Sequence, residues 1–168
     1  TRRSSDLMRL TILLGLVLVT YGEGAKIFGI FGHPGKSHFD TFEVLLKELA
    51  RRGHDVTVAS FFPQKKPIPN YTDISFEGLM PVYVNIVNFT DFEDYADYLD
   101  YALPFANLIE LNQMGSEACE KVLSSNQIQN LLKSNQKFDL VITEIFNSDC
   151  YLGLAHKLQV INGKKFSK

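Results

Sequence analysis

The segment from Ala25 to Ser60 constrains the fold of this chain more than any other part of its sequence. It opens with a short apolar run at 25–31, which is typical of a strand buried on both faces of a parallel sheet. Apolar residues then recur on one face of a helix, at Phe39, Phe42, Leu45, Leu46 and Leu49. A second strand, rich in β-branched residues, is predicted at 55–60. A strand, a helix and a parallel strand in this order predict one right-handed βαβ unit.

The loop between the first strand and the helix is the part of this unit that points to function. In open α/β sheets, ligands bind beyond the carboxyl ends of the strands, and the loop 32–38 leaves one of those ends. This loop contains two histidines, His33 and His38. They are therefore predicted to lie at the edge of the sheet where ligands bind.

A third strong strand is predicted at Phe138–Ile145, and a helix is predicted to follow at Cys150–Leu158. In a parallel sheet, polar groups that follow this strand lie at the same edge as the two histidines. Glu144 and Asp149 are those groups. The predicted fold class is α/β, with a parallel sheet and flanking helices.

The middle of the chain is less regular. The stretch 61–80 is rich in proline and lysine in its first half and is predicted to be an extended loop with little regular structure. It is either a solvated connector or a wall of a ligand pocket, because Phe61, Phe62 and Tyr71 lie just past the second strand. Minor strands are predicted at 73–76 and 81–86.

Two further helices are predicted before the third strong strand. A helical pattern runs from 91 to about 123, and Pro104 is expected to kink or split it. A shorter helix is predicted at 127–134. Aromatic residues at helical spacing in the longer segment are interpreted as core more readily than as a ligand platform; they include Tyr95, Tyr98, Tyr101 and Phe105.

Composition and charge exclude some classes of function. The chain has 168 residues and a net charge of −2, with no basic stripe, so nucleic acid is not an expected partner. Its two cysteines, Cys119 and Cys150, show neither metal-ligand spacing nor a disulfide framework. Both are therefore predicted to be buried thiols.

The first 24 residues are interpreted as upstream residues plus a secretory signal peptide. Met8 precedes an apolar run at 10–19, and Gly22 and Gly24 are small residues before a predicted cut at Ala25. One domain is predicted at 25–159, followed by an aperiodic tail at 160–168. Two glycosylation acceptor triplets, which begin at Asn70 and Asn88, have meaning in a secretory compartment.

Three motifs together resemble the amino-terminal half of animal UDP-glycosyltransferases, particularly the insect-type members. They are His33-Pro34-Gly35-Lys36-Ser37-His38-Phe39, then LLKELARRGHDVTV, and far downstream FDLVITEIFNSDC. The resemblance extends from Met8 to about Gln159. It implies the GT-B arrangement of two Rossmann-like domains, of which the amino-terminal one binds a small lipophilic acceptor.

The resemblance also implies roles for individual residues. His38, in the Ser-His-aromatic motif, is expected to be the general base. Asp149 is our choice for the acid that orients it, with Glu144 as the alternative acid. His33, Phe61 and Tyr71 are the expected acceptor-binding residues, and His33 serves either as loop structure or as pocket lining.

No metal or cofactor is expected. UDP-sugar is expected as a co-substrate bound mainly by a carboxyl-terminal domain, which the 168 residues do not contain. In the family that domain also carries a membrane anchor, and the location is the lumen of the endoplasmic reticulum. We therefore expect a fragment of a UDP-glycosyltransferase that is inactive alone, and its oligomeric state stays open.

The chemistry supports a histidine in this role. Transfer of a sugar to a hydroxyl requires deprotonation of the attacking oxygen, and imidazole titrates near the working pH. A carboxylate on the other ring nitrogen fixes the tautomer, and one direct displacement inverts the anomeric centre.

Two alternatives remain at this stage. One is a lumenal module that binds small lipophilic molecules without catalysis. The other is a nucleotide-binding domain of flavodoxin-like type, which is disfavoured because the first loop lacks a glycine-rich phosphate motif.

Overall fold

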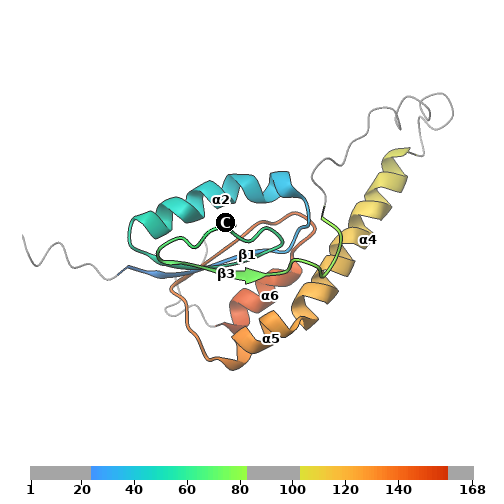
Figure 1. The fold of residues 1–168 in the computed structure, drawn as a ribbon. Coiled ribbons are helices and arrows are strands. Elements are labelled where there is room, and N and C mark those ends of the chain that lie inside the picture. Colours follow the sequence, from blue (N-terminus) through green and yellow to red (C-terminus); the bar gives the residue numbers. More distant parts are fainter. Residues whose placement is uncertain (1–23, 83–102, 159–168) are drawn as a thin grey trace, which may run out of the picture.

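The computed structural model describes residues 24–82 and 103–158, and Figure 1 shows them as one sheet covered by helices on both faces. The sheet has four strands in the order β3-β2-β1-β4, and every neighbouring pair is parallel. The strands are β1 (Lys26–Phe31), β2 (Asp55–Ser60), β3 (Tyr71–Ser75) and β4 (Leu140–Thr143). The predicted α/β class with a Rossmann-like parallel sheet is confirmed.

The four helices divide between the two faces of the sheet. α2 (Lys36–Arg51) lies on one face, and the other face is covered by three helices (Figure 1). These are α4 (Leu103–Ser124), α5 (Asn126–Lys133) and α6 (Cys150–Lys157). The arrangement follows from the parallel pairing, because each crossover must return over a face of the sheet.

The central strand β1 separates two hydrophobic cores by the alternation of its side chains. Ile27 and Phe31 pack toward α2 with Phe39 and Leu46. Phe28 and Ile30 belong to the core on the opposite face, which also contains residues of α4, α5 and α6. Because successive side chains of a strand point to opposite faces, an unbroken apolar run such as 27–31 needs cover on both faces.

The predicted βαβ unit is confirmed in its order and its parallel pairing. α2 begins after Gly35 and ends before Gly53, which adopts φ 91°. A backbone of this handedness suits glycine, and an added Cβ would meet no neighbour there. β2 then pairs with β1 in register from Asp55 opposite Lys26 to Ser60 opposite Phe31.

Some boundaries differ from the predictions. β3 begins two residues before the minor strand predicted at 73–76, and β4 is shorter than the predicted strand at 138–145. Pro104 is the second residue of α4 as the structure describes it, and the residues before Leu103 lie outside the described ranges, so its predicted kink or split stays a prediction.

Several predictions concern residues outside the described ranges. They include the leader before Gly24, the tail at 160–168, the acceptor triplet at Asn88 and the helical pattern at 91–102. Of the predicted strand at 81–86, Pro81 and Val82 are described and are not in a strand. The domain boundaries therefore stay predictions.

The prediction that both cysteines are buried thiols is wrong, because Cys119 of α4 and Cys150 of α6 form a disulfide. Their Cα atoms are 6.1 Å apart, although 31 positions separate the residues in the sequence. The spacing gave no sign of the bond, since α4 and α6 become neighbours only when both pack on the same face of the sheet.

Candidate active site

The site lies where β1 and β4 end, at the carboxyl edge of the sheet. Ile30 pairs with Thr143, so the chain leaves both strands at the same level. His38 follows in the first turn of α2, and Glu144 is the first residue after β4. Nδ1 of His38 lies 2.6 Å from Oε1 of Glu144.

The His38–Glu144 contact is short and partly shielded from solvent. The side chains of His38 and Glu144 are 28% and 19% exposed, respectively. A carboxylate only accepts hydrogen bonds, so the Nδ1 atom of His38 carries the proton and donates it. In the neutral imidazole the other nitrogen, Nε2, is then unprotonated and can receive a proton.

His38 also contacts two neighbouring aromatic rings. The ring of His33 lies 4.2 Å from that of His38, measured between centroids, and the ring of Phe146 lies 4.7 Å from it. Phe146 contacts His33 as well, edge to face, at 5.5 Å. The imidazole that meets Glu144 is therefore held by contacts with two rings as well as by a hydrogen bond.

His33 is buried in the loop that precedes α2. Its Nδ1 accepts the backbone N–H of Gly35 at 2.9 Å. Burial lowers the pKa of His33 and the nearby His38 lowers it further, while Glu144 acts in the opposite direction. Gly35 is required at this turn because an added Cβ would lie 2.8 Å from the ring of His33.

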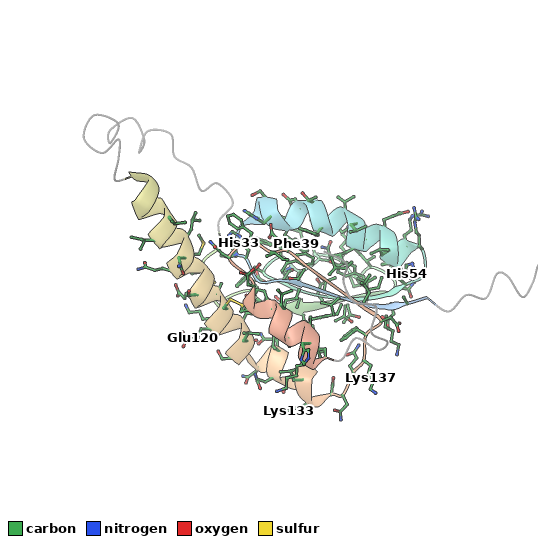
Figure 2. The ribbon with its side chains drawn as sticks, turned by 180° about the vertical axis from the view of Figure 1, so that it is seen from behind. His33, Phe39, His54, Glu120, Lys133 and Lys137 are labelled. Atoms are coloured by element: carbon green, nitrogen blue, oxygen red, sulfur yellow. A yellow bond between two sulfur atoms is a disulfide. The ribbon has the colours of Figure 1, made fainter. Side chains whose placement is uncertain are left out.

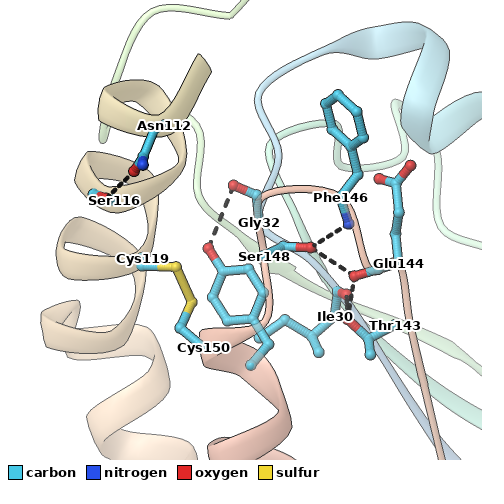
Figure 3. The surroundings of a disulfide bond; sticks show 11 residues. Ile30, Gly32, Asn112, Ser116, Cys119, Thr143, Glu144, Phe146, Ser148 and Cys150 are labelled. Atoms are coloured by element: carbon cyan, nitrogen blue, oxygen red, sulfur yellow. Dashed lines mark hydrogen bonds between the residues drawn. A yellow bond between two sulfur atoms is a disulfide. The ribbon is translucent and has the colours of Figure 1, made fainter. Parts of the chain in front are cut away.

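A network of backbone and hydroxyl contacts fixes the loop that carries Glu144 (Figure 3). The Ser148 hydroxyl donates to the Glu144 carbonyl at 2.6 Å, and it accepts the N–H of Phe146 at 3.2 Å. Thr143 donates from Oγ1 to the Ile30 carbonyl at 2.9 Å. These contacts join the loop to the end of β1, from which the histidine loop begins.

The far side of this loop is attached to α4. Asn147 adopts φ 49° and donates from Nδ2 to the Leu111 carbonyl at 2.9 Å. Gly115 lies so close that an added Cβ would stand 2.6 Å from Cβ of Asn147. The Cys119–Cys150 disulfide follows one helical turn along α4 (Figure 3). The loop 144–149 is thus attached on both sides.

Asp149, our first choice for the acid, does not occupy that position. It is exposed, it directly precedes α6, and its side chain forms no capping hydrogen bond to that helix. Glu144, the alternative acid, contacts His38 instead. The reason is that β4 ends at Thr143, so Glu144 emerges at the edge of the sheet while the next turn carries Asp149 away toward α6.

The expected acceptor-binding residues divide into different environments. Phe61 is 3% exposed and lines a groove of about 1,090 Å³ beside the start of α2. Tyr71 is buried and is not among the described residues that line this groove. His33 lies beside His38, which in turn contacts Glu144.

The groove combines apolar walls with a charged rim. Phe61, Phe62 and Met80 line it, together with Lys36 and Glu43 of α2. The ammonium of Lys36 lies over the rings of Phe39 and Phe62, at 5.3 and 5.2 Å from their centroids. Phe62, predicted from sequence as a possible wall of a ligand pocket, lines this groove. Lys36 was not predicted to line a pocket.

Other candidate groups lie away from the site. Figure 2 shows His54 near the end of α2 that is remote from His33, and Nδ1 of His54 accepts the N–H of Ala25. Asn70, the first predicted glycosylation residue, is exposed at the start of β3. Within the described ranges, no three His, Cys, Asp or Glu side chains form a group that could hold a metal ion.

Searches against family models and against solved structures found no match. The chain is 39% identical over 152 residues to UDP-glucosyltransferase 2 of Dactylopius coccus, an alignment that covers 90% of this chain and 28% of that protein. It is 31% identical to UDP-glycosyltransferase UGT4 of the same organism, over 84% of this chain and 27% of the relative.

A viral protein is also similar. The ecdysteroid UDP-glucosyltransferase of Autographa californica nuclear polyhedrosis virus is 29% identical over 82% of this chain and 28% of its own length. The chain therefore spans less than a third of the length of the relatives that it matches. None of the helices in 24–82 and 103–158 is long and apolar enough to cross a membrane. Over the segment that it shares with these relatives, the chain belongs to the UDP-glycosyltransferase family, as its motifs predicted.

Proposed function

We propose that this chain forms the acceptor-activating part of a UDP-glycosyltransferase, with His38 as the general base and Glu144 as the carboxylate that orients it. The observation that carries the proposal is the 2.6 Å contact between Nδ1 of His38 and Oε1 of Glu144 at the carboxyl edge of the sheet. A base held by a carboxylate on its far nitrogen is the arrangement that acceptor deprotonation requires.

In the proposed reaction, Nε2 of His38 takes the proton of an acceptor hydroxyl as its oxygen attacks the anomeric carbon of the sugar. The new C–O bond forms as the bond from that carbon to the UDP oxygen breaks, and the electron pair leaves with UDP. Glu144 stabilises the imidazolium that results. One displacement inverts the configuration of the anomeric centre, and the UDP-sugar is held mainly by residues beyond the described ones.

The acceptor is proposed to be a small lipophilic molecule with a hydroxyl group. The aromatic and aliphatic lining of the groove beside α2 supports this class, because ligand pockets are mostly apolar with a few polar groups. Lys36 lies close to both the groove and the base, because it lines the groove and is two residues before His38. An acceptor lying in the groove would thus extend toward the first turn of α2.

The compartment is proposed to be the lumen of the secretory pathway. The Cys119–Cys150 disulfide supports this location, because such bonds persist in oxidising compartments and are rare in the cytosol. The exposure of Asn70 leaves that residue accessible for glycosylation. Endoglycosidase treatment of the protein from insect cells tests this, since an N70Q variant should lose one glycan.

The function is tested with H38A in the complete protein that carries these residues, assayed with UDP-glucose and a phenolic acceptor. Transfer should fall on the order of 10²–10⁴-fold, while acceptor binding, followed by fluorescence quenching, stays close to wild type. Wild-type turnover in H38A would refute the role of His38. Acceptor binding without transfer by the unaltered protein would favour the second candidate, a lumenal binding module, for which the apolar groove is the supporting feature.

A further inference from the structure

The two histidines at the site have different surroundings, and the difference bears on which of them exchanges a proton. His33 retains 6% of its exposure, whereas the side chain of His38 retains 28%. Nδ1 of His33 accepts the N–H of Gly35, and a ring nitrogen that accepts a hydrogen bond carries no proton. Neutral His33 therefore has its proton on Nε2, a buried atom for which the described residues provide no hydrogen-bond acceptor.

Protonation of His33 is opposed by its surroundings. A second proton would sit on Nδ1 and point at the Gly35 N–H, which would turn a hydrogen bond into a repulsive contact. Burial disfavours the charged ring, and the neighbouring His38 adds to this effect, so the pKa of His33 is lowered despite Glu144.

The groups around His33 do not change this conclusion. His38, from α2, lowers the pKa of His33, and Glu144, which follows β4, raises it. From α6, the Tyr151 hydroxyl donates to the Gly32 carbonyl, and burial raises the pKa of Tyr151, so that its phenol stays neutral. Phe146, from the loop after β4, contributes a ring without charge.

The second relevant feature is the stacking of the two imidazoles. Their centroids are 4.2 Å apart, with planes inclined by 37°. His38 thereby contacts Glu144 through Nδ1 and the tilted rings of His33 and Phe146 through its own ring. A base whose ring is held in one orientation keeps its free nitrogen directed at one place, which is how positioning contributes to rate.

We propose that His33 is a positioning residue for the base: a permanently neutral imidazole that supports the ring of His38 by stacking and takes no part in proton transfer. The inference rests on the proposed role of His38 and extends it. Of the two neighbouring histidines, only His38 receives the proton of the acceptor.

Two variants of His33 separate stacking from hydrogen bonding in the complete protein. H33F keeps an aromatic ring against His38 but can neither titrate nor accept the Gly35 N–H, so its kcat should fall less than that of a variant without a ring. H33N can accept the Gly35 N–H through its side-chain oxygen, as in an Asx turn, but has no ring. Its kcat should fall on the order of 10- to 100-fold with KM little changed.

The outcomes that would overturn the proposal are separate for each variant. A folded H33F that has lost turnover would show that the imidazole itself is required. An H33N variant with wild-type kcat would show that stacking is dispensable. If circular dichroism shows that H33F does not fold, H33N and the nitrogen NMR spectrum of the imidazoles still test the proposal.

A measurement without catalysis is the nitrogen NMR spectrum of the imidazoles in the chain, which has four histidines that single substitutions can assign. His33 should show the neutral form protonated on Nε2 at pH values below about 6.5, the ordinary pKa of histidine. A charged His33 there, or a proton on Nδ1, would contradict the proposal. Turnover in H38A would instead refute the proposed base and leave the state of His33 as measured.

Discussion

Oε1 of Glu144 lies 2.6 Å from Nδ1 of His38, although 106 positions separate the two residues in the sequence. Glu144 follows a strand and His38 lies in the first turn of a helix, and neither residue belongs to the core. The contact exists because β1 and β4 are paired in a fixed register, so that the segments following the two strands start at the same level of the sheet.

The first prediction concerns this carboxylate. In the complete protein, E144Q should lower kcat on the order of 10²–10⁴-fold, because an amide neither fixes the tautomer of His38 nor stabilises its charged form. D149N is the matched control, since Asp149 is exposed and does not cap α6. Steady-state kinetics with UDP-glucose and a phenol make the comparison, and a loss confined to D149N would return the role to Asp149.

The second prediction concerns the close approach of α4 to the loop 144–149. G115A should destabilise the protein by about 1–3 kcal/mol and reduce transfer, because its Cβ would collide with Asn147 and displace the loop. G153A is the control in α6, where an added Cβ meets nothing within 4 Å. It should stabilise the helix by up to about 1 kcal/mol. Urea unfolding measures both, and equal stabilities would contradict the packing.

The third prediction concerns the disulfide. The double variant C119S/C150S should lose about 3–4 kcal/mol of unfolding free energy, the loop-closure value for the 31-residue separation of the two cysteines. The unaltered protein should lose a comparable amount when a reductant is added. The double variant is its own control, because its unfolding curve should not respond to reductant. A response in that variant, or none in the unaltered protein, would argue against the bond.

The fourth prediction concerns Glu43, on which three side chains of the groove converge. Lys47 and Gln64 donate to Oε1 at 2.7 and 2.8 Å, and Lys36 donates to Oε2 at 3.2 Å. Burial raises the pKa of Glu43, but these hydrogen bonds outweigh it and lower the pKa from 4.5 to about 2. Because the folded pKa is below the unfolded one, the stabilisation is complete above about pH 4.5 and is lost as the pH falls toward 2.

The variant E43Q should therefore lower the free energy of unfolding at pH 7 by about 1 kcal/mol, a value reduced for solvent screening. The difference from the unaltered protein should shrink as the pH is lowered from about 4.5 toward 2. E48Q is the matched control on α2, since Glu48 pairs with Arg51 and Arg52 in solvent and should change stability less. A pH-independent difference for E43Q would exclude this linkage.

The fold could be predicted from sequence where it depends on local periodicity. The apolar run of β1 predicted a strand, and the single apolar face of α2 predicted a helix. Gly53 predicted where that helix ends. β3 was harder to place because it lies at the edge of the sheet, where only Tyr71 among its five residues is buried. An edge strand covered on fewer sides carries a weaker hydrophobic signal.

The candidate site could be predicted only in part. His38 and the pair of acids after β4 were found, because a parallel sheet brings the ends of its strands to one edge. Phe146, which contacts both histidines, was not predicted as a site residue. Nothing in a turn sequence states which ring its aromatic residue will touch, since that depends on how the loop packs against α2.

The sequence alone determined the parallel βαβ unit, the functional edge with its two histidines and the family to which the segment belongs. These follow from the spacing of apolar residues within short segments and from sequence motifs, both of which can be recognised without the tertiary structure. The tertiary structure decided that Glu144 and not Asp149 meets His38, that Cys119 bonds to Cys150, and that the two imidazoles stack. Each of these depends on strand register and on helix packing between residues distant in sequence, or on the path of one loop in space.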